Sequence, residues 1–157
     1  MHDDIRKMIP DAWPLFFHRR NLFPVQAESI PHLVRGNNVL ISSPTASGKT
    51  ETVLAPLYQR HLSFRREQIS VVYVTPTKAL ANDIYYRAGD YLGGVGAGSG
   101  VFRYTGDHHE FKSPDNAFML VVTPEALDSL QLTKPEFLMT IRAIVVDEIH
   151  FLHGSAR

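Results

Sequence analysis

Short apolar runs separated by mixed segments dominate the hydrophobic pattern of the chain. Four of them are rich in β-branched residues and mostly do not alternate with polar ones: residues 39–41, 69–74, 118–122 and 143–146. Strands have this composition when both of their faces are covered, as in a parallel sheet between helical layers. A fifth, weaker strand is predicted at residues 101–104.

Segments with helical spacing lie between these runs. Residues 77–91 carry apolar side chains at close to helical intervals and end at two glycines. Residues 51–64 also indicate a helix, which we expect Pro56 to kink or break. Nearer the N-terminus, Pro24 suits the first turn of a helix, and Pro31 is expected to divide that region into two short helices that end at Gly36.

Alternation of strand and helix predicts an α/β, doubly wound domain with a mostly parallel sheet between two helical layers. The glycine-rich residues 93–100 are expected to form a loop inside this domain, because too little chain lies on either side for two domains. Residues 1–157 are therefore predicted to be a single domain.

Composition narrows the class of protein. The 157 residues are 44% apolar and 20% charged, which is enough apolar material for a core. The lack of cysteine excludes disulfides and thiolate metal sites. No run approaches the roughly 20 apolar residues of a membrane span, so we expect a soluble, cytoplasmic protein without membrane contact. Sixteen basic and sixteen acidic residues leave no basic surplus, so binding to nucleic acid would depend on local groups.

A candidate phosphate-binding loop spans residues 43–50, with the sequence Ser-Pro-Thr-Ala-Ser-Gly-Lys-Thr. It follows a predicted strand and opens a predicted helix, so the backbone amides of the loop and of the helix N-terminus would face an anion. Its candidate nucleotide-binding residues are Thr45, Ala46, Ser47, Gly48, Lys49 and Thr50. Lys49 would reach the phosphates and Thr50 would hold magnesium. A chance match is the alternative, since Ser43 replaces the usual first glycine.

Two adjacent carboxylates follow the last predicted strand. In a parallel sheet, ligands bind at the carboxyl ends of the strands. Asp147 is therefore expected to reach the magnesium ion, directly or through water, and Glu148 to orient or deprotonate the attacking water. Capping of the next turn is the alternative. Together with the phosphate loop, the pair predicts ATP hydrolysis, with Lys49, Asp147 and Glu148 as catalytic residues.

Two Thr-Pro units each follow an apolar strand and precede a helical stretch, at Thr75-Pro76-Thr77 and Thr123-Pro124-Glu125. They would offer hydroxyls and helix N-terminal amides to phosphates, which predicts weak sequence selectivity. Ordinary N-capping explains any one of these threonines equally well. Two such units favour contact with a nucleic-acid backbone.

These motifs resemble those of superfamily-two helicases. Residues 147–150, Asp-Glu-Ile-His, are similar to the DExH box, and residues 43–51, Ser-Pro-Thr-Ala-Ser-Gly-Lys-Thr-Glu, to the first motif of that superfamily. Residues 23–26, 75–80, 105–107 and 123–127 resemble the glutamine motif, motif Ia, the TG motif and motif Ib, in that order. The resemblance covers roughly residues 20–157, and the large helicase-related (Lhr-like) branch is the most similar group.

The resemblance implies a RecA-like P-loop domain that binds ATP and Mg²⁺ and couples hydrolysis to movement on DNA or RNA. It implies that Gln26 reads the adenine edge and that His150 couples hydrolysis to strand movement. The residues it implies for contact with the nucleic-acid backbone are Pro76, Thr77, Lys78, Thr105, Gly106, Thr123, Pro124 and Glu125. The chain ends ten residues after Asp147, so we expect it to lack the second RecA-like domain, which supplies an arginine finger in this superfamily.

Three other functions remain open. The chain could be a small-molecule kinase, although such an enzyme has no need of Thr-Pro units beside a DExH box. It could be a nucleotide- or strand-binding fragment that does not hydrolyse ATP, or the motor of a double-strand translocase that separates no strands. A metal site at residues 107–110 is disfavoured, because neighbouring side chains point in different directions. The sequence does not distinguish DNA from RNA.

Overall fold

A computed structural model describes residues 2–17, 21–44, 46–63, 68–109, 111–113 and 115–154, with the backbone alone for residues 152–154. Thr45 lies outside the described residues. The chain divides into two compact units, Met1–Ser63 and Phe64–Arg157. The prediction of one domain over residues 1–157 stays a prediction. None of the described helices is long and apolar enough to cross a membrane.

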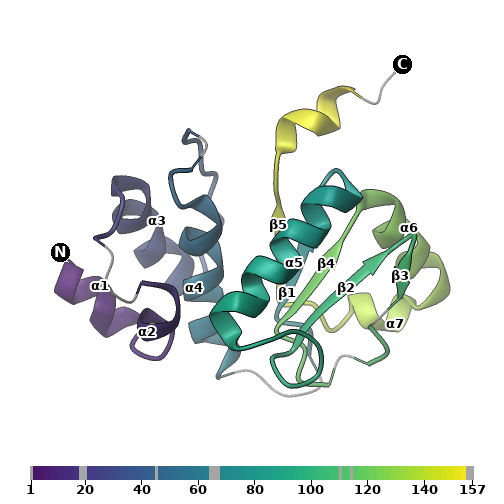
Figure 1. Cartoon of the computed structure of the whole chain (residues 1–157), viewed down its shortest axis with the longest axis horizontal. Helices are drawn as coiled ribbons and strands as arrows, with labels where there is room; N and C mark the ends of the chain where they lie inside the picture. The colour runs from purple at the N-terminus through teal and green to yellow at the C-terminus, as the bar shows by residue number, and fades with distance from the viewer. Residues whose placement is uncertain are drawn as a thin grey trace. The chain divides into compact units, whose positions relative to one another are not determined.

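The first unit consists of helices α1 (His2–Met8), α2 (Trp13–Phe16), α3 (Pro24–Val34) and α4 (Lys49–His61) in its described part (Figure 1). Helices α3 and α4 pack against each other. The buried apolar side chains of this unit include Ile5, Ile9, Phe16, Phe17, Ile30 and Leu54.

Pro31 and Pro56 both lie inside continuous helices, so the predicted division at Pro31 is wrong and Pro56 does not break its helix. A proline in a helix removes one backbone hydrogen bond and crowds the preceding turn. Here α3 and α4 are held by packing as well as by their backbone hydrogen bonds, and Ile30 and Pro56 are buried. Tertiary packing therefore overrides the local preference.

The predicted strand at residues 39–41 is also wrong. Residues 37–44 are neither helix nor strand, and the side chain of Leu40 is 84% exposed. An apolar run becomes a strand only when a neighbouring strand satisfies its backbone groups. No strand pairs with this run among the described residues.

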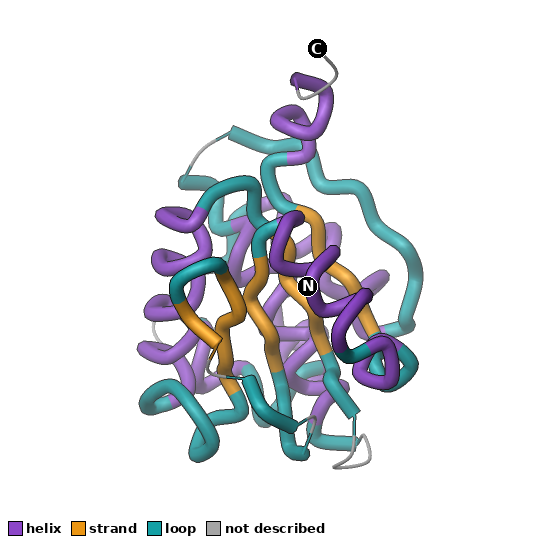
Figure 2. The backbone as a smooth tube through the Cα atoms, turned by 90° about the vertical axis from the view of Figure 1, so that its right-hand side faces the viewer, coloured by secondary structure: helices purple, strands orange, loops and turns teal. Residues whose placement is uncertain are grey.

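The second unit contains a five-stranded sheet built from β1 (Val71–Val74), β2 (Val101–Thr105), β3 (His108–His109), β4 (Met119–Val122) and β5 (Ala143–Val146). Its strand order is β3-β2-β4-β1-β5. Figure 2 shows the strands of the sheet lying side by side. All neighbours are parallel except β2 and β3, which form an antiparallel hairpin. Four of the five predicted strands are confirmed, and the parallel register brings their carboxyl ends to one edge of the sheet.

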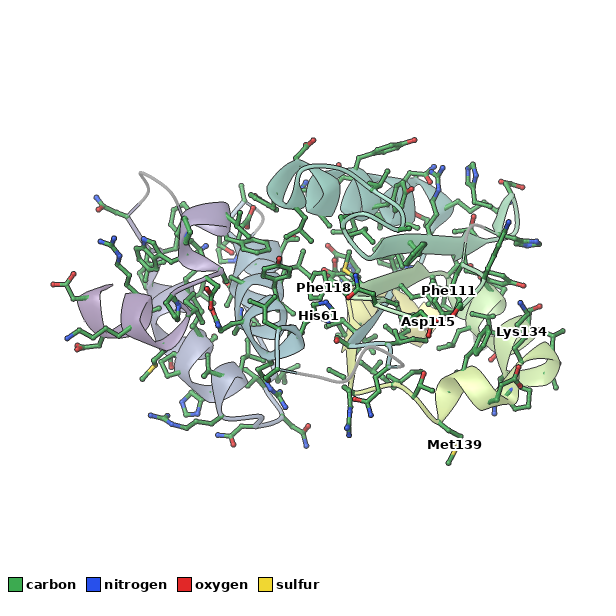
Figure 3. The ribbon with its side chains drawn as sticks, turned by 90° about the horizontal axis from the view of Figure 1, so that it is seen from below. His61, Phe111, Asp115, Phe118, Lys134 and Met139 are labelled. Carbon is green, nitrogen blue, oxygen red and sulfur yellow. The ribbon has the colours of Figure 1, made fainter. Side chains whose placement is uncertain are left out.

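Helices cover both faces of the sheet. Helix α5 (Lys78–Leu92) lies on one face, and α6 (Pro124–Thr133) and α7 (Pro135–Leu138) lie on the other (Figure 3). Alternation of side chains along the strands sends Val72, Leu120 and Val122 into the core beside α6 and α7. Phe111 joins that core with its ring centroid 5.2 Å from that of Phe137. The predicted fold class, a mostly parallel sheet between helical layers, is confirmed.

Two predicted features of the second unit have a clear local cause. The side chain of Thr77 accepts a hydrogen bond from the backbone N–H of Leu80 and so caps the start of α5. Gly93, with φ of 78°, ends that helix, and the glycine-rich segment that follows is a loop.

Strand β5 departs from the prediction that each strand is covered on both faces. It has a neighbour only on the β1 side among the described residues, and Ile144 and Val146 are 61% and 43% exposed. It is followed by a 3-10 helix, η1 (Ile149–Gly154). Position at the edge of the sheet therefore explains the exposure of a run with the composition of a buried strand.

Candidate nucleotide and nucleic-acid sites

The phosphate loop of the first unit curls around its own lysine. The Lys49 ammonium donates hydrogen bonds to the backbone oxygens of Ser43 and Pro44, over 2.7 and 2.8 Å. The hydroxyls of Ser43 and Ser47 are also hydrogen-bonded, with their oxygens 2.7 Å apart. Helix α4 begins at Lys49, and the N-terminus of a helix is a favourable place for an anion. An anion bound there would compete with the two carbonyl oxygens for the ammonium.

Gly48 has a backbone conformation and surroundings that only glycine tolerates. Its φ is 79°, in the left-handed region. A Cβ atom there would lie 2.3 Å from Nε2 of Gln26 and 3.0 Å from Cδ2 of Phe23. The turn from loop to helix is thus built around the missing side chain.

Gln26 links the start of α3 to the phosphate loop. Its side chain is 3% exposed; its Oε1 accepts from the backbone N–H of Phe23 (2.9 Å), and its Nε2 donates to the backbone oxygen of Gly48 (3.2 Å). Both polar ends of the amide are therefore bonded within this unit. Its role with adenine stays a prediction.

The other loop residues fit a phosphate site as far as they are described. Ala46 has a positive φ of 61°, and Thr50 is buried in the first turn of α4. The hydroxyl of Thr52 donates to the backbone oxygen of Gly48 over 2.7 Å and ties the turn to the helix. The loop thus offers a lysine, two serine hydroxyls and a helix N-terminus, which suit a nucleotide phosphate.

Strand β5 delivers Asp147 and Glu148 to the carboxyl edge of the sheet. The backbone N–H of Asp147 donates to the oxygen of Val74, which continues the ladder between β1 and β5 (2.9 Å). One carboxylate oxygen of Asp147 accepts from the Tyr73 hydroxyl and the other from the backbone N–H of Glu148, both over 2.9 Å. The carboxylate therefore has a defined orientation.

Glu148 and His150 are brought together at the end of this strand. Glu148 has φ of 50°, which is uncommon for a residue with a side chain and turns the chain sharply after Asp147. Its Oε2 lies 3.3 Å from Nδ1 of His150, whose ring is 4.5 Å from that of Phe151 between centroids. The predicted water-orienting and coupling residues are thus in direct contact.

Three of the segments predicted to contact nucleic acid line one groove of the second unit, with a volume of about 380 Å³. Six of the eight predicted residues contribute to it: Pro76, Lys78, Thr105, Gly106, Thr123 and Glu125. Thr77 and Pro124 do not line the groove; Thr77 caps α5, and Pro124 starts α6. The hydroxyl of Thr105 is buried without a hydrogen-bond partner, and such an orphaned group suits an added acceptor.

An ion pair stands at the rim of this groove. The Lys78 ammonium donates to the Asp107 carboxylate over 2.7 Å, and both side chains are more than half exposed. The hydrogen bond and the charge of Lys78 lower the pKa of Asp107, with a smaller contribution from His108. The groove therefore has a cation that is already paired with an acid.

Sequence reasoning did not name four lining residues as contacts: Tyr104, His109, Ser129 and Ala126, the last of which lies in the segment that resembles motif Ib. Tyr104 and His109 are paired across the β2–β3 hairpin, and their rings are stacked with centroids 4.6 Å apart. A hairpin centred on Gly106-Asp107, a common two-residue turn, would have placed these two rings opposite each other.

Residues 107–110, which were considered as a metal site, do not converge: Asp107 and His109 contact different partners. Asp107 forms an ion pair with Lys78, and the ring of His109 stacks on that of Tyr104. Glu110 lies outside the described residues. In the described part of the chain, no three metal-binding side chains gather.

A mostly parallel sheet with carboxylates at the end of a strand, in a chain with a phosphate loop before a helix, defines a RecA-like nucleotide-binding fold. A solved structure titled as a hypothetical ATP-dependent RNA helicase from Sulfolobus tokodaii has this fold, with a TM-score of 0.71 at 22% identity. The match covers 98% of this chain and 43% of that one.

The chain belongs to the DEAD/DEAH box helicase family, whose model matches residues 23–157. It is 35% identical over 140 residues to the ATP-dependent DNA helicase Hel308 of Caldivirga maquilingensis, a match that covers 88% of this chain. It is 34% identical over 156 residues to the ATP-dependent helicase Lhr-Core of Methanothermobacter thermautotrophicus, covering 84% of this chain. The chain spans 18% of the length of each of these relatives. The predicted resemblance is confirmed, and ATP binding follows from the family.

Proposed function

We propose that this chain is the ATP-binding lobe of a motor that couples Mg-ATP hydrolysis to movement on DNA or RNA. The observation that carries the proposal is the groove of the second unit. Segments around residues 76, 105 and 123, which are far apart in sequence, line it together. Membership of the DEAD/DEAH box helicase family supports the same proposed function.

The proposed nucleotide chemistry uses residues of both motifs. Lys49 exchanges the carbonyl oxygens of Ser43 and Pro44 for phosphate oxygens, and the amides around Gly48 approach the phosphates closely. Magnesium, when bound, neutralises charge that develops on the transferred phosphoryl group. Thr50 and Asp147 are its proposed ligands.

The other site residues complete the proposed mechanism. Glu148 orients or deprotonates the attacking water. His150, which contacts Glu148, couples ATP hydrolysis to movement of the nucleic-acid strand. Gln26 is proposed to recognise adenine. That role requires its amide to exchange a bond to Phe23 or Gly48 for one to the base.

Strand binding in this proposal depends on the backbone of the nucleic acid. The hydroxyls of Thr105 and Thr123, the Lys78 ammonium and the N-terminus of α6 offer donors to phosphates along the groove. These groups are indifferent to base identity, so we expect weak sequence selectivity. The partner is DNA or RNA.

Calorimetric titration of Mg-ATP into the chain and into Lys49→Ala tests the nucleotide site. We expect binding by the chain and a loss of at least tenfold in affinity in the variant, because the ammonium forms charge-assisted bonds to the phosphates. Lys112→Ala, which removes an exposed lysine from the second unit, is the matched control and should bind as the unchanged chain does. No binding by the unchanged chain would contradict the proposal.

Strand separation is proposed to require a second RecA-like domain in a longer protein, as the greater length of the relatives allows. The purified chain should then bind ATP, hydrolyse it slowly and separate no strands. A fluorescence assay with a forked duplex measures this directly. Robust unwinding by these 157 residues would show that no second lobe is needed.

A further inference from the structure

We propose that Tyr73 is a positioning residue for the Asp147 carboxylate, and through it for the metal-nucleotide. This inference rests on the proposed function of Asp147. Tyr73 lies on β1, outside every motif considered above, and its hydroxyl donates a 2.9 Å hydrogen bond to Oδ2 of Asp147.

The parallel register of β1 and β5 explains how this contact arises. Tyr73 is paired with Val145, and paired residues in neighbouring strands share a face of the sheet. Asp147 lies two residues beyond Val145, so its side chain projects from the same face. A tyrosine is long enough to span that offset, whereas the valines around it are not.

The ring and the hydroxyl of Tyr73 have different roles in this buried position. Tyr73 is 3% exposed and stands in a strand of valines, Val71, Val72 and Val74. Its ring fills space in the core, which phenylalanine would fill as well. The hydroxyl adds a polar group that costs free energy when buried without a partner, and Asp147 is a partner for it.

The bond completes a three-point attachment of Asp147. The backbone N–H of Asp147 donates to the oxygen of Val74 and so fixes the backbone. The Glu148 N–H donates to one carboxylate oxygen of Asp147, and the Tyr73 hydroxyl donates to the other. A carboxylate has about four lone-pair sites, so these two donors leave room for a hydrated metal ion. Because both oxygens are restrained, the carboxylate loses little rotational freedom when the ion binds.

Tyr73→Phe removes the hydroxyl and keeps the ring. In the presence of ATP, we expect the affinity for Mn²⁺, followed by its electron paramagnetic resonance signal as a stand-in for Mg²⁺, to fall about tenfold, since one charge-assisted hydrogen bond is lost. ATP affinity measured in EDTA should not change. Tyr86→Phe, which removes a hydroxyl from an exposed tyrosine on α5, is the matched control and should bind Mn²⁺ normally.

A double-mutant cycle with Asp147→Ala distinguishes positioning from general destabilisation. Without the carboxylate, Tyr73→Phe should have no further effect on Mn²⁺ affinity. An additive loss, or unchanged Mn²⁺ affinity in Tyr73→Phe, would overturn the inference while leaving the proposed function intact. Failure of the unchanged chain to bind metal and nucleotide would instead overturn both.

A measurement on the folded chain covers the case in which Tyr73→Phe does not fold. The hydroxyl proton of Tyr73, followed by NMR, should exchange slowly with water in the unchanged chain and at least tenfold faster in Asp147→Ala. Equal exchange rates in the two proteins would overturn the inference.

Discussion

Gly48 illustrates how one residue determines the conformation of the proposed phosphate loop. A side chain there would combine an unfavourable backbone conformation with a collision with Gln26, and Gln26 is itself bonded at both ends. The alternatives are to move the glutamine or to move the loop. Either change alters the backbone that surrounds Lys49.

Gly48→Ala should therefore lower stability by about 1–3 kcal/mol, from positive φ and the close contact, and should greatly weaken ATP binding. Urea denaturation and calorimetry measure the two effects. Gly98→Ala is the matched control, because a Cβ at Gly98 has no atom within 4 Å and no unusual φ. Equal stability of the Gly48 and Gly98 variants would show that the turn adapts at little cost.

His61, at the end of α4, gives a pH dependence with a definite sign. Burial lowers the pKa of its imidazole below the ordinary value of 6.5. Between the two pKa values the unfolded chain binds more protons than the folded one, so stability rises with pH. The contribution is present above pH 6.5 and is lost as pH falls through the folded pKa.

His61→Gln should flatten that dependence. We expect the free energy of unfolding of the unchanged chain to fall more between pH 7.5 and pH 5 than that of the variant, because the unfolded chain takes up a proton on His61 that the folded chain resists. Urea titrations at both pH values provide the comparison. Parallel losses in the two proteins would exclude His61 as the source.

At the scale of elements, the β2–β3 hairpin places an acid beside a groove that we propose for phosphates. Asp107 holds the Lys78 ammonium and adds a negative charge at the rim. A strand entering the groove would compete with Asp107 for this lysine. We therefore expect phosphate binding through Lys78 to be weaker than an unpaired lysine would give, which is consistent with the proposed motor function.

Asp107→Asn should tighten binding of a labelled single-stranded oligonucleotide by several-fold at low salt, whereas Lys78→Ala should weaken it and reduce the salt slope by about 1. Fluorescence anisotropy at several salt concentrations measures both. Asp115→Asn, at an exposed aspartate in another loop of the same unit, controls for a change of net charge. Weaker binding by Asp107→Asn would mean that the acid organises the groove.

Element types were mostly predictable, because apolar runs of four or five residues and capped helices are local signals. Residues 77–91 illustrate this, with a threonine cap and a terminal glycine at the positions where α5 begins and ends. The errors came from tertiary context. Pro31 and Pro56 lie in helices held by packing, and residues 39–41 have no strand to pair with among the described residues.

At the scale of the whole molecule, the sequence motifs predicted which residues belong to the candidate sites but not which residues contact each other. The order of the motifs along the chain predicted the family, and a shared carboxyl edge of the sheet predicted that several segments would meet. The bonds between Gln26 and Gly48 and between Tyr73 and Asp147 join positions that are 22 and 74 residues apart. Only the register of strands and the packing of helices create such pairs.

The side of β5 that has no neighbouring strand among the described residues has a consequence for the behaviour of the chain in solution. A sheet edge without a neighbouring strand is a template for another strand. In the described part of the chain β5 is such an edge, and its exposed Ile144 and Val146 add apolar surface there. If this edge is accessible in solution, concentrated samples of these 157 residues should associate through intermolecular β-pairing. A strand that paired with this edge would block such association.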